Sequence, residues 1–263
     1  MLNGSIMVEA GISTWRSPKA VLITHRHTDH SAALCDAICP RSAIKKGQEH
    51  LKGRPVYAPA EAIPMLAQLC TAYSCLSTGK LPVDPFASCG MHEMPVSIGD
   101  TFTIPGIPDV VVEVVKCYHT CECVGYGFSI LKRRLNPKYR GLDKQGLIAL
   151  KKSGTDITET VTEPQVIFFG DTTPDALFNH TEWQKYPNVF IECTACKLNG
   201  EDLQLEARKR RERGHTHVVE LKELIERHSE GRRWFLQHTS AACTPEELRI
   251  VRESIQADVV IVE

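Results

Sequence analysis

Three histidines and one aspartate stand within the six-residue segment HRHTDH, residues 25–30. Imidazole nitrogens and carboxylate oxygens bind divalent transition metals, and such ligands need a rigid mount. The apolar run at residues 20–24 predicts a buried strand, whose end would supply that mount. The alternative interpretation is a polar surface loop. The spacing favours a metal site, and with it a hydrolase, whose first candidate ligands are His25, His27, Asp29 and His30.

Further side chains that could bind metal follow three later apolar runs. His119 comes after the run at residues 111–115, Asp171 closes the run VIFFG, and His238 closes the run WFLQ. Each has a plain alternative, because a histidine at a strand end is often a surface group and a Gly-Asp-Thr sequence often forms a turn or cap. Together with the first segment they place metal-binding residue types at four strand ends. We therefore expect several loops to converge on one metal site.

The composition is that of a globular chain of 263 residues, with 42% hydrophobic and 24% charged side chains. This size allows one large domain or two small ones. Because no strongly polar linker divides the chain, we predict a single domain over residues 1–263. Lysine and arginine number 31 against 32 aspartate and glutamate residues, for a formal charge of −1. No global basic field indicates nucleic-acid binding, so any RNA-binding surface must be local.

The sequence carries no signal for export or membrane insertion. Its first ten residues lack a basic region followed by an apolar one, and no later segment is long and apolar enough to span a bilayer. The 11 cysteines fit a reducing compartment, in which thiols act as small buried hydrophobic groups. We expect an intracellular, cytoplasmic protein without a membrane partner, and leave the nucleus and the organelles open.

Short β-branched or aromatic runs alternate with helical patterns along the chain. Strands are predicted at residues 5–9, 20–24, 55–57, 109–115, 125–131, 166–169, 189–192, 234–237 and 259–262. Helices are predicted at residues 64–76, 200–213, 217–228 and 245–256. This alternation predicts an α/β protein in which helices cover sheet layers and functional loops lie at the strand ends.

At this point the residues resemble the metallo-β-lactamase superfamily and, within it, the ribonuclease Z branch. Residues 25–30 are similar to the first metal motif of the superfamily. The later motifs are matched by His119 with Gly125-Tyr126, by Gly170-Asp171-Thr172 and by His238-Thr239-Ser240. The resemblance to ribonuclease Z, which processes the 3′ end of tRNA, rests on Ile191-Glu192-Cys193-Thr194, Gly214-His215-Thr216-His217 and residues 136–141 and 154–158. The motifs extend from residue 5 to about residue 250.

The resemblance implies an αβ/βα metallo-β-lactamase sandwich of two mixed sheets flanked by helices, with a site for two divalent ions along one edge. It implies one ion held by His25, His27 and His119, a second held by Asp29, His30 and His238, and Asp171 as the bridge between them. Zinc is the expected metal because imidazole and carboxylate ligands suit it, and manganese and iron are the alternatives.

The same resemblance implies hydrolysis of a phosphodiester. Two metal ions about 3.5–4 Å apart lower the pKa of a bridging water and favour in-line attack of hydroxide on phosphorus. Asp29 would be both a ligand and the proton acceptor, and His215, oriented by Glu192, would protonate the departing ribose oxygen. His217 is the alternative donor, and simple capping of the next helix is the plain alternative for this motif. The products would be an RNA with a 3′-hydroxyl and a trailer with a 5′-phosphate.

Two local clusters of basic side chains could contact phosphates. The run RKRRER at residues 208–213 lies just before His215. A solvated helix face is the alternative for this run, because nearby acidic residues partly neutralise it. The second cluster comprises Lys132, Arg133, Arg134, Lys138 and Arg140. Neither cluster by itself establishes RNA binding.

Three features depart from the ribonuclease Z pattern. The first residues of the chain resemble the strand before the first metal motif, so we expect the glycine-rich N-terminal hairpin of the family to be missing, either by truncation or because the sheet is built differently. Residues 132–164 are expected to be too few for the long arm with which ribonuclease Z enzymes grip the tRNA elbow. Residues 240–243 replace the aromatic and basic residues usual after the last metal histidine.

Three functions follow from these observations. The first is an endoribonuclease that cleaves the 3′ trailer of precursor tRNA, or another phosphodiester, with a homodimer left open. The second is a hydrolase of a small phosphodiester, lactone or thioester on the same scaffold, favoured by the missing arm and the near-neutral charge. The third is a non-catalytic binding module with a degenerate site, which is disfavoured because every expected ligand is present.

Overall fold

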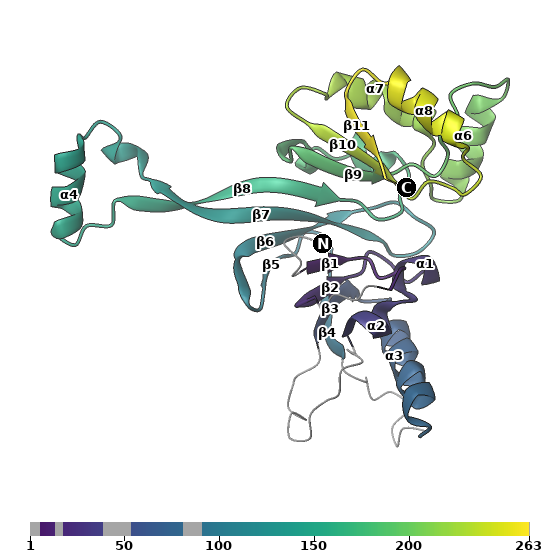
Figure 1. The fold of residues 1–263 in the computed structure, drawn as a ribbon, viewed down its shortest axis with the longest axis horizontal. Helices are drawn as coiled ribbons and strands as arrows, with labels where there is room; N and C mark the ends of the chain where they lie inside the picture. The colour runs from purple at the N-terminus through teal and green to yellow at the C-terminus, as the bar shows by residue number, and fades with distance from the viewer. Residues whose placement is uncertain (1–5, 14–17, 39–53, 81–90, 263) are drawn as a thin grey trace.

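In the computed structural model, the chain folds into an αβ/βα sandwich, and a long arm projects from it (Figure 1). It describes residues 6–13, 18–38, 54–80 and 91–262. The described strands form one sheet of four, in the order β1-β2-β3-β4, and one sheet of seven, in the order β11-β10-β9-β8-β7-β6-β5. The sandwich expected from the sequence is therefore the observed fold.

The smaller sheet contains β1 (Ile6–Val8), β2 (Ala20–Leu22), β3 (Arg54–Pro59) and β4 (Met91–Val96). All three described pairings are parallel, so this sheet differs from the mixed sheet that was expected. Parallel strands are normally covered on both faces. Here α2 (Leu34–Ile38) and α3 (Ile63–Thr78) cover the outer face, and the apolar residues of β2 are completely buried.

The larger sheet is mixed. Its strands are β5 (Thr101–Ile104), β6 (Ile107–Lys116), β7 (Val124–Leu135), β8 (Thr158–Phe168), β9 (Asn188–Glu192), β10 (Arg233–Gln237) and β11 (Asp258–Ile261). Pairing is antiparallel from β5 to β8 and parallel from β8 to β11. Because β6 and β8 both run opposite to β7, their carboxyl ends lie at the same edge as those of β9 and β10.

The remaining helices lie around the sandwich, except for those at the far end of the arm (Figure 1). They are α1 (Thr28–Ser31), α4 (Lys144–Lys152), α5 (Asp175–Phe178), α6 (Leu203–Glu212), α7 (Val218–Arg227) and α8 (Pro245–Ser254), with 3-10 turns η1 (Pro137–Tyr139) and η2 (Glu182–Lys185). Thr244 and Glu247 form a reciprocal capping box at the start of α8. Among the described residues, no helix has the length and apolar character that crossing a bilayer would require.

Three apolar layers hold the sandwich together. The middle layer joins the two sheets, and Tyr57 of β3 stacks there on Phe102 of β5 with ring centroids 4.3 Å apart. A second layer lies between the smaller sheet and α2 and α3. The third lies between the larger sheet and the helices of the C-terminal half, and contains Trp183 and Trp234. This arrangement fixes the two sheets, and hence the loops at their common edge, relative to each other.

The segment between β7 and β8 projects as an arm, so the expectation that it is too short to do so is wrong. The two strands pair out to Leu135 and Thr158, and Figure 1 shows them running away from the sandwich to α4 at the far end. The expectation failed because it considered the number of residues in the segment and not the length that two extended, paired strands span. A strand advances about 3.3 Å per residue, so a single hairpin of modest length extends far from the domain.

Trp234 should be a principal contributor to stability. Its side chain is fully buried, and its ring centroid lies 5.5 Å from that of Trp183. We predict that Trp234→Ala lowers the free energy of unfolding by about 3–5 kcal/mol, because it removes a large apolar group and leaves a cavity. Urea denaturation followed by circular dichroism measures this change. Phe178→Ala, at a side chain that is 50% exposed, is the aromatic control and should cost less than about 0.5 kcal/mol. Equal losses would contradict the prediction.

Candidate metal centre

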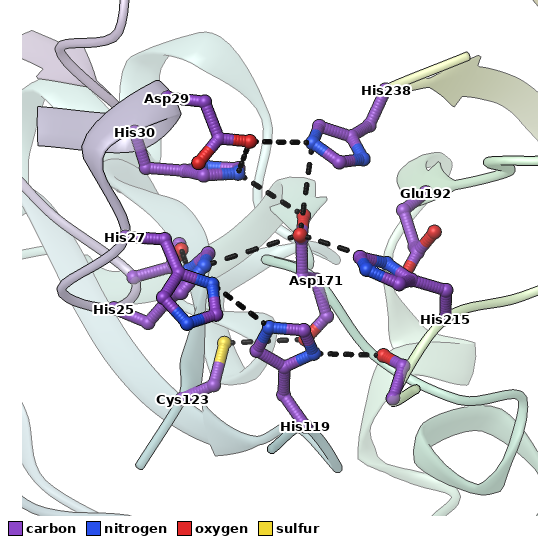
Figure 2. A network of polar contacts seen from close by, with 12 residues as sticks. His25, His27, Asp29, His30, His119, Cys123, Asp171, Glu192, His215 and His238 are labelled. Carbon is purple, nitrogen blue, oxygen red and sulfur yellow. Dashed lines mark hydrogen bonds and ion pairs between the residues drawn. The ribbon is translucent and has the colours of Figure 1, made fainter. Parts of the chain in front are cut away.

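The strand directions bring all seven candidate ligands to one edge of the sandwich. His25 and His27 follow β2, and Asp29 and His30 lie in α1. His119 follows β6, Asp171 follows β8 and His238 follows β10. Figure 2 shows their side chains pointing toward a common space, with Asp171 in the middle. The expected convergence of loops is therefore present in the structure.

Three histidines form the first group. Potential ligand atoms of His25, His27 and His119 lie within 4.8 Å of one another. The Nδ1 atom of His25 is 3.0 Å from the hydroxyl of Thr24, and that of His119 donates to the carbonyl of Gly214 at 2.9 Å. These contacts orient both rings and leave each Nε2 atom facing the group, which is how a metal-binding histidine is usually held.

Two histidines and two aspartates form the second group. Ligand atoms of Asp29, His30, Asp171 and His238 also lie within 4.8 Å of one another. His238 Nε2 is 3.3 Å from Asp29 Oδ2, and His30 Nε2 is 3.5 Å from the same oxygen. The Asp29 side chain is 62% exposed, whereas those of His30 and Asp171 are buried. This group therefore opens to solvent on the Asp29 side.

Asp171 stands between the two groups. Its Oδ1 atom is 3.3 Å from His30 Nε2, and its Oδ2 atom is 3.6 Å from His238 Nε2 and 3.9 Å from His25 Nε2. The carboxylate thus faces histidines of both groups at once. A position of this kind suits a ligand shared by two cations.

Glu9 is a participant that the sequence analysis missed. Its Oε2 atom lies 3.2 Å from His30 Nδ1, and its Oε1 atom accepts the backbone N–H of Thr24 at 3.2 Å. Glu9 and His238 have φ values of 64° and 57°, and no other non-glycine residue in the described ranges has a positive φ. Such strained backbone commonly marks functional sites. The available signal was an acid at the last position of the first predicted strand.

The histidines respond differently to their surroundings. Burial, with repulsion from His30, lowers the pKa of His25 to about 3. Burial also acts against a charge on His30, but contacts with Asp171 and Glu9 outweigh it and raise that pKa to about 10. Although burial opposes ionisation of Asp171, contact with His30 holds its pKa well below the usual range. His25 is therefore neutral, Asp171 is an anion and His30 carries a proton. A metal ion bound to these residues would displace the proton of His30.

The donor set fits a divalent cation. The Nε2 atom of His25 is buried without a hydrogen-bond partner among the described residues. An unsatisfied buried polar atom costs about 1–3 kcal/mol, so its retention calls for a ligand. Imidazole nitrogens and carboxylate oxygens are what zinc and related metals bind. These residues could therefore hold metal, as their types and spacing had suggested.

His215 and Glu192 lie beside this centre. Glu192 is fully buried at the end of β9, where its Oε1 atom is 3.0 Å from His215 Nδ1 and accepts the Thr172 N–H at 2.9 Å. Its Oε2 atom accepts the Thr194 hydroxyl at 2.5 Å. His215 Nδ1 is also 3.7 Å from Asp171 Oδ2. The bond to Glu192 raises the pKa of His215 against the opposing effect of burial.

His217 occupies a different environment. It is fully buried at the N-cap of α7, where its Nδ1 atom accepts the N–H of Val219 at 3.2 Å. The nearest acid is Glu206, 3.9 Å from its Nε2 atom. The hydroxyl of Thr216 donates to the carbonyl of Thr172 at 2.6 Å and does not cap the helix. Capping is thus what His217 does, whereas His215 faces the centre.

Comparisons with known proteins find relatives among the tRNase Z proteins of plants. The chain is 26% identical to tRNase Z TRZ1 of Arabidopsis thaliana over 87% of this chain and 75% of that protein. It is 23% identical to the chloroplastic tRNase Z TRZ2 of the same plant over 92% of this chain but only 63% of the relative, so it spans less than two thirds of that protein. No protein-family model matches.

A solved structure gives the same picture of the fold. The short form of human tRNase Z matches with a TM-score of 0.51 at 14% identity, over 99% of this chain and 86% of that chain. The sandwich, with its histidines and aspartates at one edge, has the metallo-β-lactamase fold. Among proteins of this fold, the chain is similar in sequence to the plant tRNase Z proteins.

Gly214 lets α6 end directly against His119. Its φ is +77°, and a Cβ atom there would lie 2.5 Å from His119 Nδ1. We predict that Gly214→Ala displaces the His119 ring and weakens metal binding by about 10–100-fold, as the loss of a contact that orients a ligand does. Gly231→Ala is the control, because Gly231 has a φ of +65° but a Cβ atom there would have no neighbour within 4 Å among the described residues. Titration with a competing chelator measures the affinity, and similar losses in both variants would refute the prediction.

Proposed function

We propose that the protein is a metal-dependent endoribonuclease that cleaves the 3′ trailer from precursor tRNA. The observation that carries the proposal is the bond between His215 and the buried Glu192 next to the candidate metal centre. A ribose oxygen leaves poorly unless it is protonated, and a positioned histidine can supply that proton. The tRNase Z names of the two plant relatives support the same substrate class.

The proposed cofactors are two divalent ions. His25, His27 and His119 would hold one, Asp29, His30 and His238 the other, and Asp171 would bridge them. When bound, such ions supply a water of lowered pKa and neutralise charge on the phosphoryl oxygens. Zinc suits the imidazole-rich donor set, and manganese or iron would also be accommodated.

The proposed roles of the protein side chains concern proton movement. Asp29 is the exposed carboxylate of the centre and would accept a proton from the attacking water. Glu192 accepts the Nδ1 hydrogen of His215, which leaves Nε2 as the nitrogen that donates to the departing ribose oxygen. Cleavage of the phosphorus–oxygen bond then yields a 3′-hydroxyl on the RNA and a 5′-phosphate on the trailer. We assign this role to His215 and not to His217, which caps α7.

The arm weakens the support for one of the functions that were considered from the sequence. Its supposed absence was one of two arguments for a small-substrate hydrolase, beside the near-neutral charge, and the projecting β7–β8 hairpin removes that argument. A projecting hairpin supports a substrate that extends well beyond the metal centre. The convergence of every candidate ligand also weighs against a degenerate, non-catalytic site. A homodimer and a cytoplasmic location stay predictions.

Cleavage of RNA tests the proposal directly. We expect protein loaded with Zn²⁺ or Mn²⁺ to cut a precursor tRNA once, at the start of its 3′ trailer. His27→Ala should abolish the reaction, because it removes one of the proposed metal ligands. Gel analysis of end-labelled RNA measures the product. If the wild-type protein cuts no faster than His27→Ala with either metal, the proposal is wrong. A rate on bis(p-nitrophenyl) phosphate without RNA cleavage would favour the small-substrate hydrolase.

A pair of histidine variants tests the proton donor. We expect His215→Ala to lower kcat by about 10²–10⁴-fold, because it removes general acid catalysis. His217→Asn should keep a kcat near that of the wild type, since asparagine also caps helices. Single-turnover kinetics on precursor tRNA measure the rates, and metal analysis verifies that both variants stay loaded. A larger loss in His217→Asn than in His215→Ala would reverse the assignment.

A further inference from the structure

The C-terminal half of α6 carries the basic run at residues 208–213, and it leads directly into the candidate site. The backbone N–H of His215 donates to the carbonyl of Arg210 at 3.0 Å. Gly214, which precedes His215, accepts a hydrogen bond from His119. Cations on the last turn of a helix also offset the negative end of its dipole. That effect explains the presence of basic residues, but not how they are distributed around the helix.

The run divides into paired and unpaired cations. Arg208 pairs with Glu212 at 3.1 Å, and Arg211 pairs with Asp175 and Glu220, so these two residues serve the local structure. In the part of the chain that the structure describes, no ion pair involves the other three cations, Lys209, Arg210 and Arg213.

The three unpaired cations share one face of α6. With Glu206 they follow the spacing i, i+3, i+4, i+7 and line a hollow of about 310 Å³. Glu206 stands at the right distance along the helix to pair with Lys209 or Arg210. Instead, its carboxylate lies 3.4 Å from Lys197 and 3.9 Å from His217. The hollow therefore keeps an excess of positive charge that no side chain in the described ranges neutralises.

We propose that Lys209, Arg210 and Arg213 form a phosphate-binding surface that holds the RNA backbone next to the candidate metal centre. This inference rests on the proposed function, because it assumes an RNA substrate. Arginine and lysine bind phosphate oxygens without reading sequence, so the surface positions the strand and does not select bases. A solvated helix face, the alternative from sequence, would be expected to pair its charges as Arg208 and Arg211 do.

Three cations of the second basic cluster, at the outer end of β7, differ from those of this surface. Lys132 and Arg134 both pair with Glu163, and Arg133 pairs with Asp156. Those three cations already have partners, whereas the three on α6 have none among the described residues. Lys138 and Arg140 of the same cluster have no ion pair among the described residues, but they lie beyond Leu135, the last residue of β7. The inference therefore concerns α6, which leads directly to His215.

The salt dependence of RNA binding tests the surface. Anisotropy of a labelled precursor tRNA with a methylphosphonate at the cleavage site measures Kd from about 50 to 200 mM KCl, a range over which phosphate contacts weaken strongly. The test variant is Lys209→Gln with Arg210→Gln and Arg213→Gln. The control removes three cations from the outer helices, by Lys222→Gln with Arg227→Gln and Arg249→Gln. A charge-conserving variant, Lys209→Arg with Arg210→Lys and Arg213→Lys, tests for effects on folding.

Each phosphate contact to a single strand contributes about 0.7 to the slope of log Kd against log salt. Because the test variant lacks three cations, we expect its slope to fall by about 2 and its binding to be on the order of tenfold weaker. The control and the charge-conserving variant should keep the wild-type slope. Equal slopes in the test variant and the control would overturn the inference, as would a wild-type protein whose binding ignores salt. Binding is measured without cleavage, so a protein that binds through α6 but does not cut would refute the proposed function alone.

Discussion

The buried carboxylate of Asp171 is the group on which the arrangement of the site depends. It lies 3.3–3.9 Å from imidazole nitrogens of three separate segments, which carry His25 with His30, His215, and His238. An anion held away from water is costly unless charges or hydrogen bonds compensate it. The histidines provide that compensation here, and the rings of His25 and His30 are oriented in turn by Thr24 and Glu9. The site is therefore a network in which each member limits the freedom of the next.

This network can form only if the two sheets keep a fixed separation. The segment that carries His25 belongs to the smaller sheet, while Asp171 and His238 belong to the larger one. Glycines permit the close approach of their loops. A Cβ atom at Gly170 would lie 2.5 Å from the side chain of Thr24, and one at Gly214 equally close to His119. The apolar layer between the sheets thus determines the geometry of polar groups at its edge.

The same constraint separates two histidines that look equivalent in the sequence. His215 and His217 are two residues apart, yet one bonds to Glu192 near Asp171 and the other caps α7. Their difference arises because Gly214 ends α6 in a left-handed conformation and the chain turns there toward His119. Neighbouring cations of α6 differ in the same way. Some pair with nearby acids, and others line a hollow without a partner among the described residues.

The sequence by itself determined which side chains gather at the edge, because metal-binding residue types at strand ends and the direction of parallel strands suffice for that. It also located nine of the strands, including the buried run Ala20–Leu22. It did not reveal β4 and β5, whose apolar pattern is weak. Contacts between distant segments were equally out of reach: the Glu9–His30 pair, the choice between His215 and His217, and the partners of the α6 cations. The reach of the arm was misjudged, since it depends on the pairing of two strands. Only tertiary packing decides such features, because they depend on distances between residues far apart in the chain.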